Sequence, residues 1–368
     1  MRILLTSNAS YAPARGGSTR SNLVWLRHLV EHGHACRVVC TSLTEDSEDT
    51  AGGIQIFSIR NLVQRRSLLE NHIHEFHPDF VLVSSEDLSH LLLGEATRVA
   101  PDRILYLAHT PQFFPFGAES WNRDTKATEM IRSARALVAI GHTTAAYIEQ
   151  ATRVNPAVIH PPIYGQPPFA RLGCFDSGAV LMINPCQVKG IGIFVELARL
   201  FPDYPFAALA GWGTTTADRK ALELLSNVRL IESVDNIEEA LAQARVLLMP
   251  SLWYEGFGLI AMEAMLRGIP VISSDSGGLV EARQGTGFVI PVRRIERYLS
   301  QFDETHMPRP VIPEQDLKPW SQALKSLLGD RTFYDAESER CRIAALNFVA
   351  RLDASDLEKL LLSLGASN

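Results

Sequence analysis

The fold is decided by one stretch of sequence, Pro250-Ser-Leu-Trp-Tyr-Glu-Gly-Phe-Gly-Leu-Ile-Ala-Met-Glu-Ala-Met-Leu-Arg-Gly-Ile-Pro-Val271. The apolar run just before it, residues 246–249, is typical of a buried strand that a proline closes. Residues 257–266 are helix formers, and a glycine and a proline follow them as helix-ending signals. Residues 271–273 then form a second strand. This order predicts the βαβ unit of a parallel sheet, whose loop and helix N-terminus lie at the ligand-binding edge.

The loop inside this stretch has the features of an anion site flanked by two carboxylates. Gly256 and Gly258 let backbone N–H groups approach a ligand closely, and the helix N-terminus adds the positive end of a dipole. Glu255 precedes the helix, and Glu263 lies within it, about 7 Å of helix rise beyond Gly258. Carboxylates accept hydrogen bonds well from sugar hydroxyls. A nucleotide-sugar, which joins a diphosphate to two sugars, would therefore satisfy all three features.

Either glutamate alone would be interpreted as an ordinary solvated residue, but the combination favours a site. The letters Glu255-Gly-Phe-Gly-Leu…Glu263-Ala…Gly268-Ile-Pro-Val resemble the E-x7-E signature of glycosyltransferase family 4, which contains retaining enzymes with the GT-B fold. The resemblance implies that Glu255 holds hydroxyls of the donor sugar and that Glu263 holds the nucleotide ribose. It also places four neighbouring residues in the donor-binding loop: Gly256, Phe257, Gly258 and Leu259.

Composition indicates a soluble globular protein with substantial cores, because 46% of the 368 residues are hydrophobic and 21% are charged. A net charge of −6 argues against a nucleic-acid partner or an anionic membrane surface. The N-terminus becomes polar too soon for a signal peptide, and no apolar run reaches transmembrane length. The five cysteines have no zinc-site spacing. A cytoplasmic location is therefore expected. The sequence gives no oligomeric state.

Strands and helices alternate along the chain, which predicts an α/β protein with doubly wound parallel sheets. The predicted strands are 2–6, 36–40, 54–57, 80–83, 104–107 and 136–140 in the first half, and 179–183, 206–210, 228–231, 246–249, 271–273 and 288–291 in the second. Residues 301–314 are rich in proline, and residues 315–364 are largely helical.

The densest proline and glycine segment lies between residues 154 and 178, and we place the domain boundary there. We predict an N-terminal Rossmann-like acceptor-side domain over 1–155, a linker over 156–177 and a C-terminal Rossmann-like nucleotide-sugar donor domain over 178–345. The family resemblance implies that the two domains face a central cleft, as in GT-B proteins. It also implies that the terminal helix, within 346–368, crosses back onto the first domain.

Two features of the first half suit the nucleotide-sugar transfer that the family resemblance implies. Gly16 and Gly17 precede a helix after the first strand and suit another anion contact, which the family places at this loop. His109 follows the strand 104–107. From spacing alone it is equally a satisfied loop histidine or a residue that faces the cleft, and the resemblance implies the latter, near the reacting carbon.

Four aromatic residues follow His109, and two prolines among them prevent a regular element. These residues form either an acceptor wall or a group packed beneath a loop, and both interpretations stay open. They are Phe113, Phe114, Phe116 and Trp121.

In the second half, Lys189 lies where a strand turns into a helix. It resembles the lysine of the family's G-R-x4-K-G motif, which implies a contact with the donor diphosphate. Asn184 stands where the family usually has arginine, so one positive charge is missing. Arg15 and Arg283 are candidates to replace that charge.

Two further loops complete the expected donor side. The stretch Gly211-Trp-Gly213 resembles half of a dinucleotide fingerprint, and the family places a glycine pair here in the donor cleft. Residues 232–234, which end at Val234, follow a strand and are expected beside the nucleotide base.

The resemblance implies a retaining glycosyltransferase that moves a hexose-type sugar from a nucleotide-diphosphate sugar to a hydroxyl acceptor. No metal and no cofactor are expected. The catalytic residues would be His109, Glu255 and Lys189. The compact first half and the aromatic loop hint at a small-molecule or peptide-like natural product as acceptor, and a glycan or a lipid is the alternative.

Three other functions fit parts of the sequence. A glycosidase could use Glu255 and Glu263 as acid and nucleophile, but it would have no use for Lys189 or the glycine turns. A nicotinamide-dependent oxidoreductase would rest on Gly211 and Gly213, and the missing third glycine argues against it. A non-catalytic or catalytically weak sugar-nucleotide-binding protein would have lost activity with the arginine.

Overall fold

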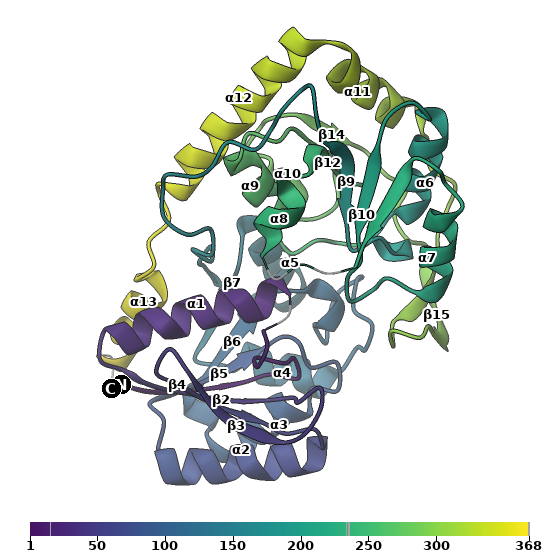
Figure 1. Cartoon of the computed structure of the whole chain (residues 1–368). Helices are drawn as coiled ribbons and strands as arrows, with labels where there is room; N and C mark the ends of the chain where they lie inside the picture. Colours follow the sequence, from purple (N-terminus) through teal and green to yellow (C-terminus); the bar gives the residue numbers. More distant parts are fainter. Residues whose placement is uncertain (15, 233, 235, 367–368) are drawn as a thin grey trace. The chain divides into compact units, whose positions relative to one another are not determined.

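The computed structural model describes residues 1–14, 16–232, 234 and 236–366 (Figure 1). The chain divides into two compact units. The first consists of Met1–Gly165 together with Leu352–Asn368, and the second of Gln166–Arg351. The terminal segment is therefore part of the N-terminal unit, although more than 180 residues of the other unit separate it from Gly165.

In its described part, the N-terminal unit has an eight-stranded sheet with the order β3-β4-β2-β1-β5-β6-β7-β8. The strands are β1 (Arg2–Thr6), β2 (Ala35–Cys40), β3 (Ser47–Ala51), β4 (Ile54–Ser58), β5 (Phe80–Ser84), β6 (Ile104–Ala108), β7 (Ala136–Ala139) and β8 (Ala157–Val158). The helices are α1 (Gly17–Glu31), α2 (Leu62–Phe76), α3 (Leu91–Val99), η1 (Pro101–Arg103), η2 (Pro111–Phe113), α4 (Thr125–Arg132), α5 (His142–Thr152) and α13 (Asp356–Gly365).

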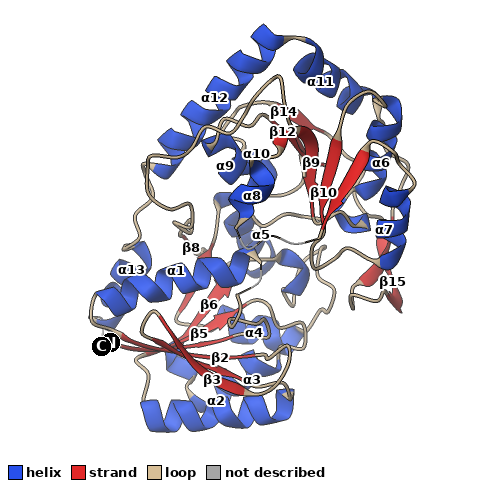
Figure 2. Ribbon diagram, in the orientation of Figure 1, coloured by secondary structure: helices blue, strands red, loops and turns tan. Residues whose placement is uncertain are grey.

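This sheet is parallel except at its edge, where β3 runs antiparallel to β4. Helices cover both faces, with α1 on one side and α2 on the other (Figure 2). The central strands β5 and β6 are buried along their whole length, as expected of parallel strands covered on both faces. The edge strand β3 has the polar sequence Ser-Glu-Asp-Thr-Ala, which explains why no strand was predicted there.

In its described part, the C-terminal unit has a six-stranded parallel sheet with the order β11-β10-β9-β12-β13-β14. The strands are β9 (Ala179–Ile183), β10 (Phe206–Leu209), β11 (Val228–Ile231), β12 (Ala244–Met249), β13 (Val271–Ser274) and β14 (Phe288–Ile290), and a separate hairpin contains β15 (Arg297–Phe302) and β16 (Pro308–Val311). The helices are η3 (Gln187–Lys189), α6 (Ile191–Leu200), α7 (Thr216–Glu223), α8 (Ile237–Leu241), α9 (Leu259–Leu266), α10 (Leu279–Ala282), α11 (Lys318–Gly329) and α12 (Arg331–Val349).

The predicted α/β class and all predicted strands are confirmed, with differences at the margins. Helix α9 begins at Leu259, two residues later than predicted, because Phe257 and Gly258 form the loop that leads into it. The proline-rich segment forms the β15–β16 hairpin, where Pro308 and Pro310 are tolerated because a two-stranded ribbon has only edge strands.

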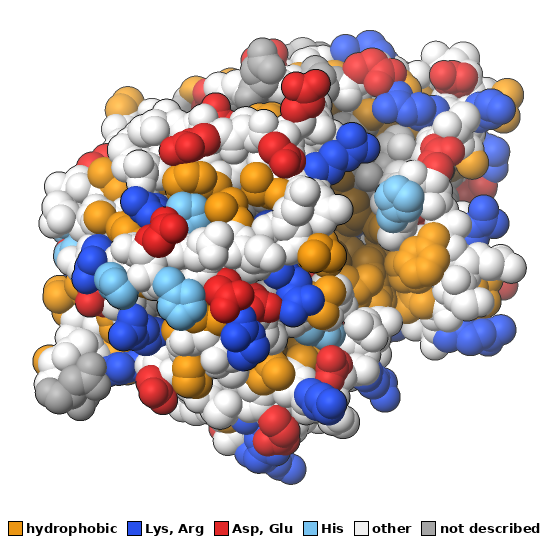
Figure 3. All heavy atoms as spheres, turned by 90° about the horizontal axis from the view of Figure 1, so that it is seen from below, with side chains coloured by type: hydrophobic (Ala, Val, Ile, Leu, Met, Phe, Trp, Pro, Cys, Tyr) orange, Lys and Arg blue, Asp and Glu red, His pale blue; other side chains and the backbone are white. Residues whose placement is uncertain are grey.

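The surface agrees with the modest net charge. Figure 3 shows acidic and basic side chains interspersed on the face that it displays. Among the described residues, none of the helices is both long enough and apolar enough to cross a membrane.

Candidate active site

The carboxyl ends of neighbouring parallel strands lie at one edge of a sheet, so the loops that follow them meet there. In the C-terminal unit, three such loops follow the adjacent strands β9, β12 and β13. They are residues 184–190, 250–258 and 275–278. Asn184 and Lys189 lie in the first, Glu255 to Gly258 lie in the second, and the third is the glycine turn after β13. The other predicted donor-side residues of this unit follow β10 and β11 or lie in α9.

Lys189 and Glu255, predicted separately from two motifs, form an ion pair. The Nζ atom of Lys189 lies 2.6 Å from Oε1 of Glu255, and the two side chains are only 16% and 12% exposed. The same carboxylate oxygen accepts a hydrogen bond from the Ser251 hydroxyl. The ammonium group also lies 4.1 Å from the centre of the Trp253 ring, within cation–π range. Both charges are thus fixed in place.

Backbone contacts hold the first two loops together. Gly190 has a φ of +82°, and a Cβ there would lie 2.1 Å from the carbonyl oxygen of Pro250. The Val188 carbonyl accepts hydrogen bonds from the N–H groups of Leu252 and Trp253, at 2.9 and 3.2 Å. The glycine after Lys189 is therefore required for the close approach of the two backbones.

The end of β13 and the loop after it, residues 274–278, donate hydrogen bonds to the backbone of the Glu255 loop. The Gly278 N–H donates to the Glu255 carbonyl at 2.8 Å. Ser274 and Ser276, both buried, donate from their hydroxyls to the carbonyls of Ser251 and Trp253, at 2.7 and 2.5 Å. Sequence reasoning did not single out these serines, because their partners lie 23 residues away.

Helix α9 begins directly after Glu255. Gly258 takes a φ of +106° at its N-cap, and no described side chain caps the helix there. The first backbone N–H groups of such a helix point outward, where an anion can accept hydrogen bonds from them. Glu263, on the second turn, is only 4% exposed. Glu263 is therefore buried, and the interpretation that it is an ordinary solvated helix residue is wrong.

Asn184 takes a structural position in place of the usual arginine. Its φ is +56°, a left-handed conformation that asparagine tolerates better than most residues. Its Oδ1 atom accepts a hydrogen bond from the Gly213 N–H at 2.9 Å. A Cβ on Gly211 would lie 2.6 Å from the same oxygen. Asn184 thus joins the loop after β9 to the glycine loop after β10.

The proposal that Arg283 replaces the missing arginine is wrong. Arg283 is fully buried, and burial lowers the pKa of its guanidinium. Its Nη2 atom donates to the carbonyls of Val271 and Thr286, at 2.8 and 3.2 Å. The guanidinium group therefore lies in the core and is not available to a ligand. The other candidate, Arg15, lies outside the described residues.

Trp212 was not among the predicted site residues, because the dinucleotide-type pattern around it depends only on its glycine neighbours. Its side chain is 52% exposed, and its ring centre lies 5.6 Å from that of Trp253. Val234, expected beside the nucleotide base, is half-buried after β11, and residue 233 lies outside the described residues.

In the N-terminal unit, His109 belongs to a buried hydrogen-bond network. Its Nε2 atom lies 2.9 Å from Oδ1 of Asn22, on α1. The amide nitrogen of Asn22 donates to the Tyr11 hydroxyl at 2.7 Å and to the Ser84 hydroxyl at 2.9 Å. Because Asn22 Oδ1 can only accept, Nε2 carries the hydrogen. Burial lowers the pKa of His109, which keeps the imidazole neutral.

The glycine turn that was predicted before the first helix is present at the start of α1. Gly16 has a φ of +96° and precedes the helix, which begins at Gly17 without a described side-chain cap. Asn22, one and a half turns further along α1, carries the contact to His109. The same helix thus begins at the glycine loop and positions the histidine.

The aromatic loop after β6 divides into two pairs. Phe114 and Phe116 are buried in the core of the unit, so they do not fit an open acceptor wall. Phe113 and Trp121 are half-buried, and their rings pack edge to face with centres 5.6 Å apart. Packing beneath the loop is therefore the correct interpretation for the first pair.

Two protein-family models match most of the chain. The model described as Glycosyltransferase Family 4 matches residues 15–164, and the model described as Glycosyl transferases group 1 matches residues 179–304. A relative from Klebsiella pneumoniae, described as an uncharacterized 42.6 kDa protein in the cps region, is 30% identical over 93 residues. That match covers 25% of this chain and 25% of the relative.

Solved structures share the whole fold. Sucrose-phosphate synthase from Thermosynechococcus elongatus has a TM-score of 0.76 at 16% identity, with 100% of both chains covered. HepE from Anabaena, in complex with UDP and glucose, has a TM-score of 0.69 at 16% identity, also with 100% of both chains covered. A glycosyltransferase from Rickettsia africae has a TM-score of 0.67 at 14% identity, with 99% and 98% covered. With this fold throughout and a glycosyltransferase family model on each half, the protein belongs to the family 4-like glycosyltransferases of the GT-B fold.

Proposed function

We propose that the protein transfers a hexose-type sugar from a nucleotide-diphosphate sugar to a hydroxyl acceptor, with retention of anomeric configuration and without a metal ion on the donor diphosphate. The observation that carries this proposal is the Lys189–Glu255 pair beside the N-terminus of α9. A cation, a row of backbone N–H groups and a hydroxyl-binding carboxylate are the groups that an activated sugar needs. HepE, which shares the fold, binds UDP and glucose, and this supports the choice of donor class.

Lys189 would stabilise the leaving diphosphate. Negative charge develops on that group as the glycosidic bond breaks, and a fixed ammonium group lowers the energy of the transition state. Glu255 lies 2.6 Å from this ammonium group. Donor binding would exchange partners, so that Lys189 turns to phosphate and Glu255 to sugar hydroxyls.

The rest of the donor would follow the C-terminal unit's sheet edge. The N–H groups at Gly256, Gly258 and Leu259 would bind phosphate, with Phe257 buried beneath them as the anchor of the loop. Glu263 would accept hydrogen bonds from the ribose. Gly211 and Val234 would lie on the nucleotide side. Asn184 would act by holding the Gly213 loop in place rather than by supplying charge.

The N-terminal unit would supply His109 and the Gly16–Gly17 turn. A neutral imidazole whose Nε2–H is held by Asn22 can offer a polar contact near the reacting carbon without introducing a positive charge. The glycine turn at the start of α1 would add N–H groups for the diphosphate. The acceptor would meet Phe113 and Trp121, the two half-buried aromatics of the loop after β6. A small-molecule or peptide-like acceptor is proposed first, and a glycan or lipid second.

No side chain needs to become covalently attached to the sugar. A phosphate oxygen of the leaving group can take the proton of the acceptor hydroxyl while the acceptor attacks from the same face. Positive charge from Lys189 and from the helix dipoles would take the place of a metal ion on the diphosphate.

The test is incubation of the purified protein with a panel of nucleotide-diphosphate sugars and hydroxyl acceptors. Released nucleotide diphosphate and the anomeric signal of the product would be measured by NMR. Retention of configuration, unaffected by a chelator, is the expected result. Inversion, or activity that chelation abolishes and a divalent metal restores, would contradict the proposed mechanism.

A second candidate is a catalytically weak sugar-nucleotide-binding protein. The observation that favours it is Asn184, because the usual arginine is absent and the asparagine is held in the fold by Gly213. Tight binding of a nucleotide-sugar without turnover on any acceptor of the panel would support this candidate over the enzyme.

A further inference from the structure

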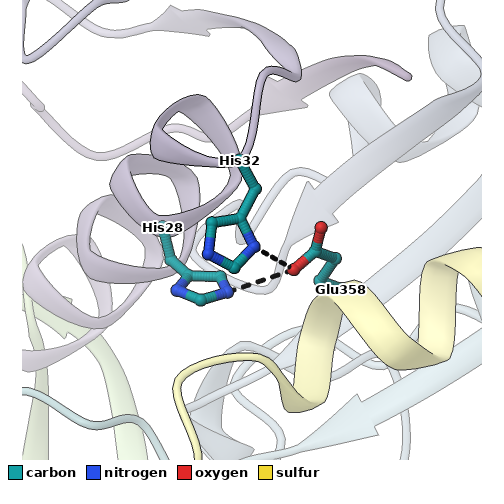
Figure 4. A group of neighbouring side chains, drawn as sticks. All are labelled: His28, His32 and Glu358. Atoms are coloured by element: carbon teal, nitrogen blue, oxygen red, sulfur yellow. Dashed lines mark hydrogen bonds and ion pairs between the residues drawn. The ribbon is translucent and has the colours of Figure 1, made fainter.

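A cluster of three histidines and one glutamate joins the first and last helices of the N-terminal unit. His28 lies in the last turn of α1, and His32 is its C-cap residue. Glu358 lies in the first turn of α13. Its Oε2 atom lies 3.2 Å from Nε2 of His28 and 2.6 Å from Nδ1 of His32 (Figure 4).

The spacing of the two histidines directs them to one side of α1. Residues four apart on a helix are neighbours on its surface, and here the two ring centres lie 4.0 Å apart. Figure 4 shows both rings turned toward the carboxylate of Glu358. The ligand-type atoms of His28, His32 and Glu358 all lie within 4.8 Å of one another.

Two imidazole nitrogens and one carboxylate oxygen are a ligand set that Zn²⁺ uses in proteins. With metal–ligand bonds of about 2.0–2.2 Å, tetrahedral ligand atoms lie roughly 3.3 Å apart. The His28–Glu358 distance is already 3.2 Å, and the His32–Glu358 distance is 2.6 Å. The first distance therefore matches a tetrahedral site as it stands, and the second would have to lengthen to roughly 3.3 Å when the ion binds.

His34 supports the carboxylate from its other side. Its Nε2 atom lies 2.9 Å from Oε1 of Glu358, which leaves Oε2 facing the two helix histidines. The turn that ends α1 brings His34 there: Gly33 has a φ of +81°, and the His34 N–H donates to the Leu29 carbonyl at 2.9 Å. Such outer contacts orient the ligands of metal sites.

Charge and exposure suit a bound cation. A glutamate carboxylate ordinarily carries a negative charge at neutral pH. His28 and Glu358 are largely covered, whereas the His32 side chain is 46% exposed. The exposed side leaves a path for the ion and for a water molecule as fourth ligand.

We propose that His28, His32 and Glu358 bind one divalent transition-metal ion, with Zn²⁺ as the best match, and that this ion fastens α13 to α1. Helix α13 has ten residues, of which Leu357 and Leu361 are buried. The bound ion would therefore add to a small apolar contact. The ligands lie at the far end of α1 from the Gly16–Gly17 turn. The ion would therefore hold the fold and take no part in sugar transfer.

The expectation of no metal came from cysteine spacing and from the family resemblance. This cluster is made of histidines whose third partner lies 330 positions further along the chain. Only folding brings Glu358 to them. A cluster without metal, in which the histidines simply donate hydrogen bonds to Glu358, is the simpler alternative, and the experiment separates the two.

The test uses the untagged full-length protein after treatment with a chelator and dialysis. We expect calorimetric titration with Zn²⁺ to show one ion per chain. With Co²⁺ as probe, we expect the visible absorption bands of a four-coordinate site. His28→Ala, His32→Ala and Glu358→Gln should each weaken Zn²⁺ affinity at least tenfold and remove the Co²⁺ bands.

His74→Ala is the matched control. His74 also pairs with a glutamate four residues away, Glu70, at 3.8 Å on α2, and it belongs to no three-ligand group among the described residues. This variant should bind Zn²⁺ like the wild type. Proteolysis adds a second measurement: Zn²⁺ should slow cleavage between α12 and α13 in the wild type and have no such effect in His32→Ala.

Three results would overturn the proposal. The first is a stripped wild-type protein that takes up no Zn²⁺ in the titration, a result that needs no variant and so is independent of any folding defect. The second is Zn²⁺ binding that the His28 and His32 substitutions leave unchanged, with circular dichroism confirming that the variants are folded. The third is stoichiometric binding that fails to protect the segment before α13.

Discussion

The ammonium group of Lys189 lies 2.6 Å from the carboxylate of Glu255, although 66 positions separate the two residues in the chain. Each comes from a loop that follows a different strand of the same parallel sheet. The close backbone contact at Gly190 and the two hydrogen bonds to the Val188 carbonyl hold the two loops together. The two charges therefore act as one unit, and the predictions below follow from its construction.

Glu255→Gln should lower the rate of sugar transfer at least a hundredfold, because an amide cannot replace a carboxylate that accepts hydrogen bonds from sugar hydroxyls. The variant keeps the shape of the side chain, so the melting temperature should change by only a few degrees. Steady-state kinetics and thermal melting measure the two effects. Glu196→Gln, on the exposed Arg199 pair of α6, is the control and should retain full activity. A fully active Glu255→Gln would contradict the assigned role.

Gly190→Ala should reduce stability and donor binding together. The added Cβ would lie 2.1 Å from the Pro250 carbonyl oxygen, and the φ of +82° is unfavourable for alanine. Displacing the loop would separate Lys189 from Glu255. Gly192→Ala is the matched control, since its Cβ meets no atom within 4 Å and it lies in helix α6. Urea unfolding should show a loss for the first variant and no loss for the second; equal stabilities would refute the close-approach argument.

Asn184→Arg should strengthen binding of a nucleoside diphosphate, because it restores the positive charge usual at this position. It should also lower the free energy of unfolding by about 1–3 kcal/mol, because arginine is strained at a φ of +56° and the Gly213 N–H loses its acceptor. Calorimetry with UDP and urea unfolding measure the two effects separately. Asn184→Gly relieves the backbone strain without adding charge and serves as the comparison. An unchanged affinity for UDP in the arginine variant would count against the missing-charge interpretation.

His109 predicts a dependence of stability on pH. Burial lowers its pKa in the folded protein, whereas the unfolded chain takes up a proton near the ordinary value of about 6.5. The unfolded state therefore binds more protons below that pH, and the free energy of unfolding must fall as the pH drops. The loss attributable to this residue is at most about 1.4 kcal/mol per pH unit.

Urea unfolding at pH 7.5 and 5.5 tests this expectation. His109→Gln keeps a side-chain N–H donor for Asn22 but cannot titrate, so its stability should fall less between the two pH values than that of the wild type. His74→Gln, at an exposed histidine, should behave like the wild type. An identical pH response of the wild type and His109→Gln would show that His109 is not held neutral by burial.

The donor-side loops could be predicted from sequence because their signals are local. Glycines, a proline and the two glutamates occur within one short stretch around Gly258, and the preceding apolar strand needs no distant partner to be recognised. The central strands were predicted for the same reason. The edge strand β3 and the proline-containing hairpin β15–β16 were missed, because polar and proline-rich letters form strands only through the partner beside them.

The burial and the contacts of individual side chains were harder to predict than secondary structure. Phe113 and Phe114 are adjacent, yet the first is half-buried and the second lies in the core. Asn22 contacts His109 across 87 positions, and nothing in the letters around either residue indicates the contact. Arg283 looked like an available charge after a glycine turn but is enclosed in the core. Each of these outcomes depends on which chain segments pack together.

The central claim is that Lys189 and Glu255 form the donor-binding unit of a nucleotide-sugar transferase. Its most direct test is calorimetric titration of the wild type and of Lys189→Met with UDP and with UDP-glucose; other nucleoside diphosphates would follow if neither binds. We predict that the wild type binds a nucleoside diphosphate and that Lys189→Met binds it at least tenfold more weakly, while remaining folded. Equal affinities of the two proteins for the diphosphate would contradict the account.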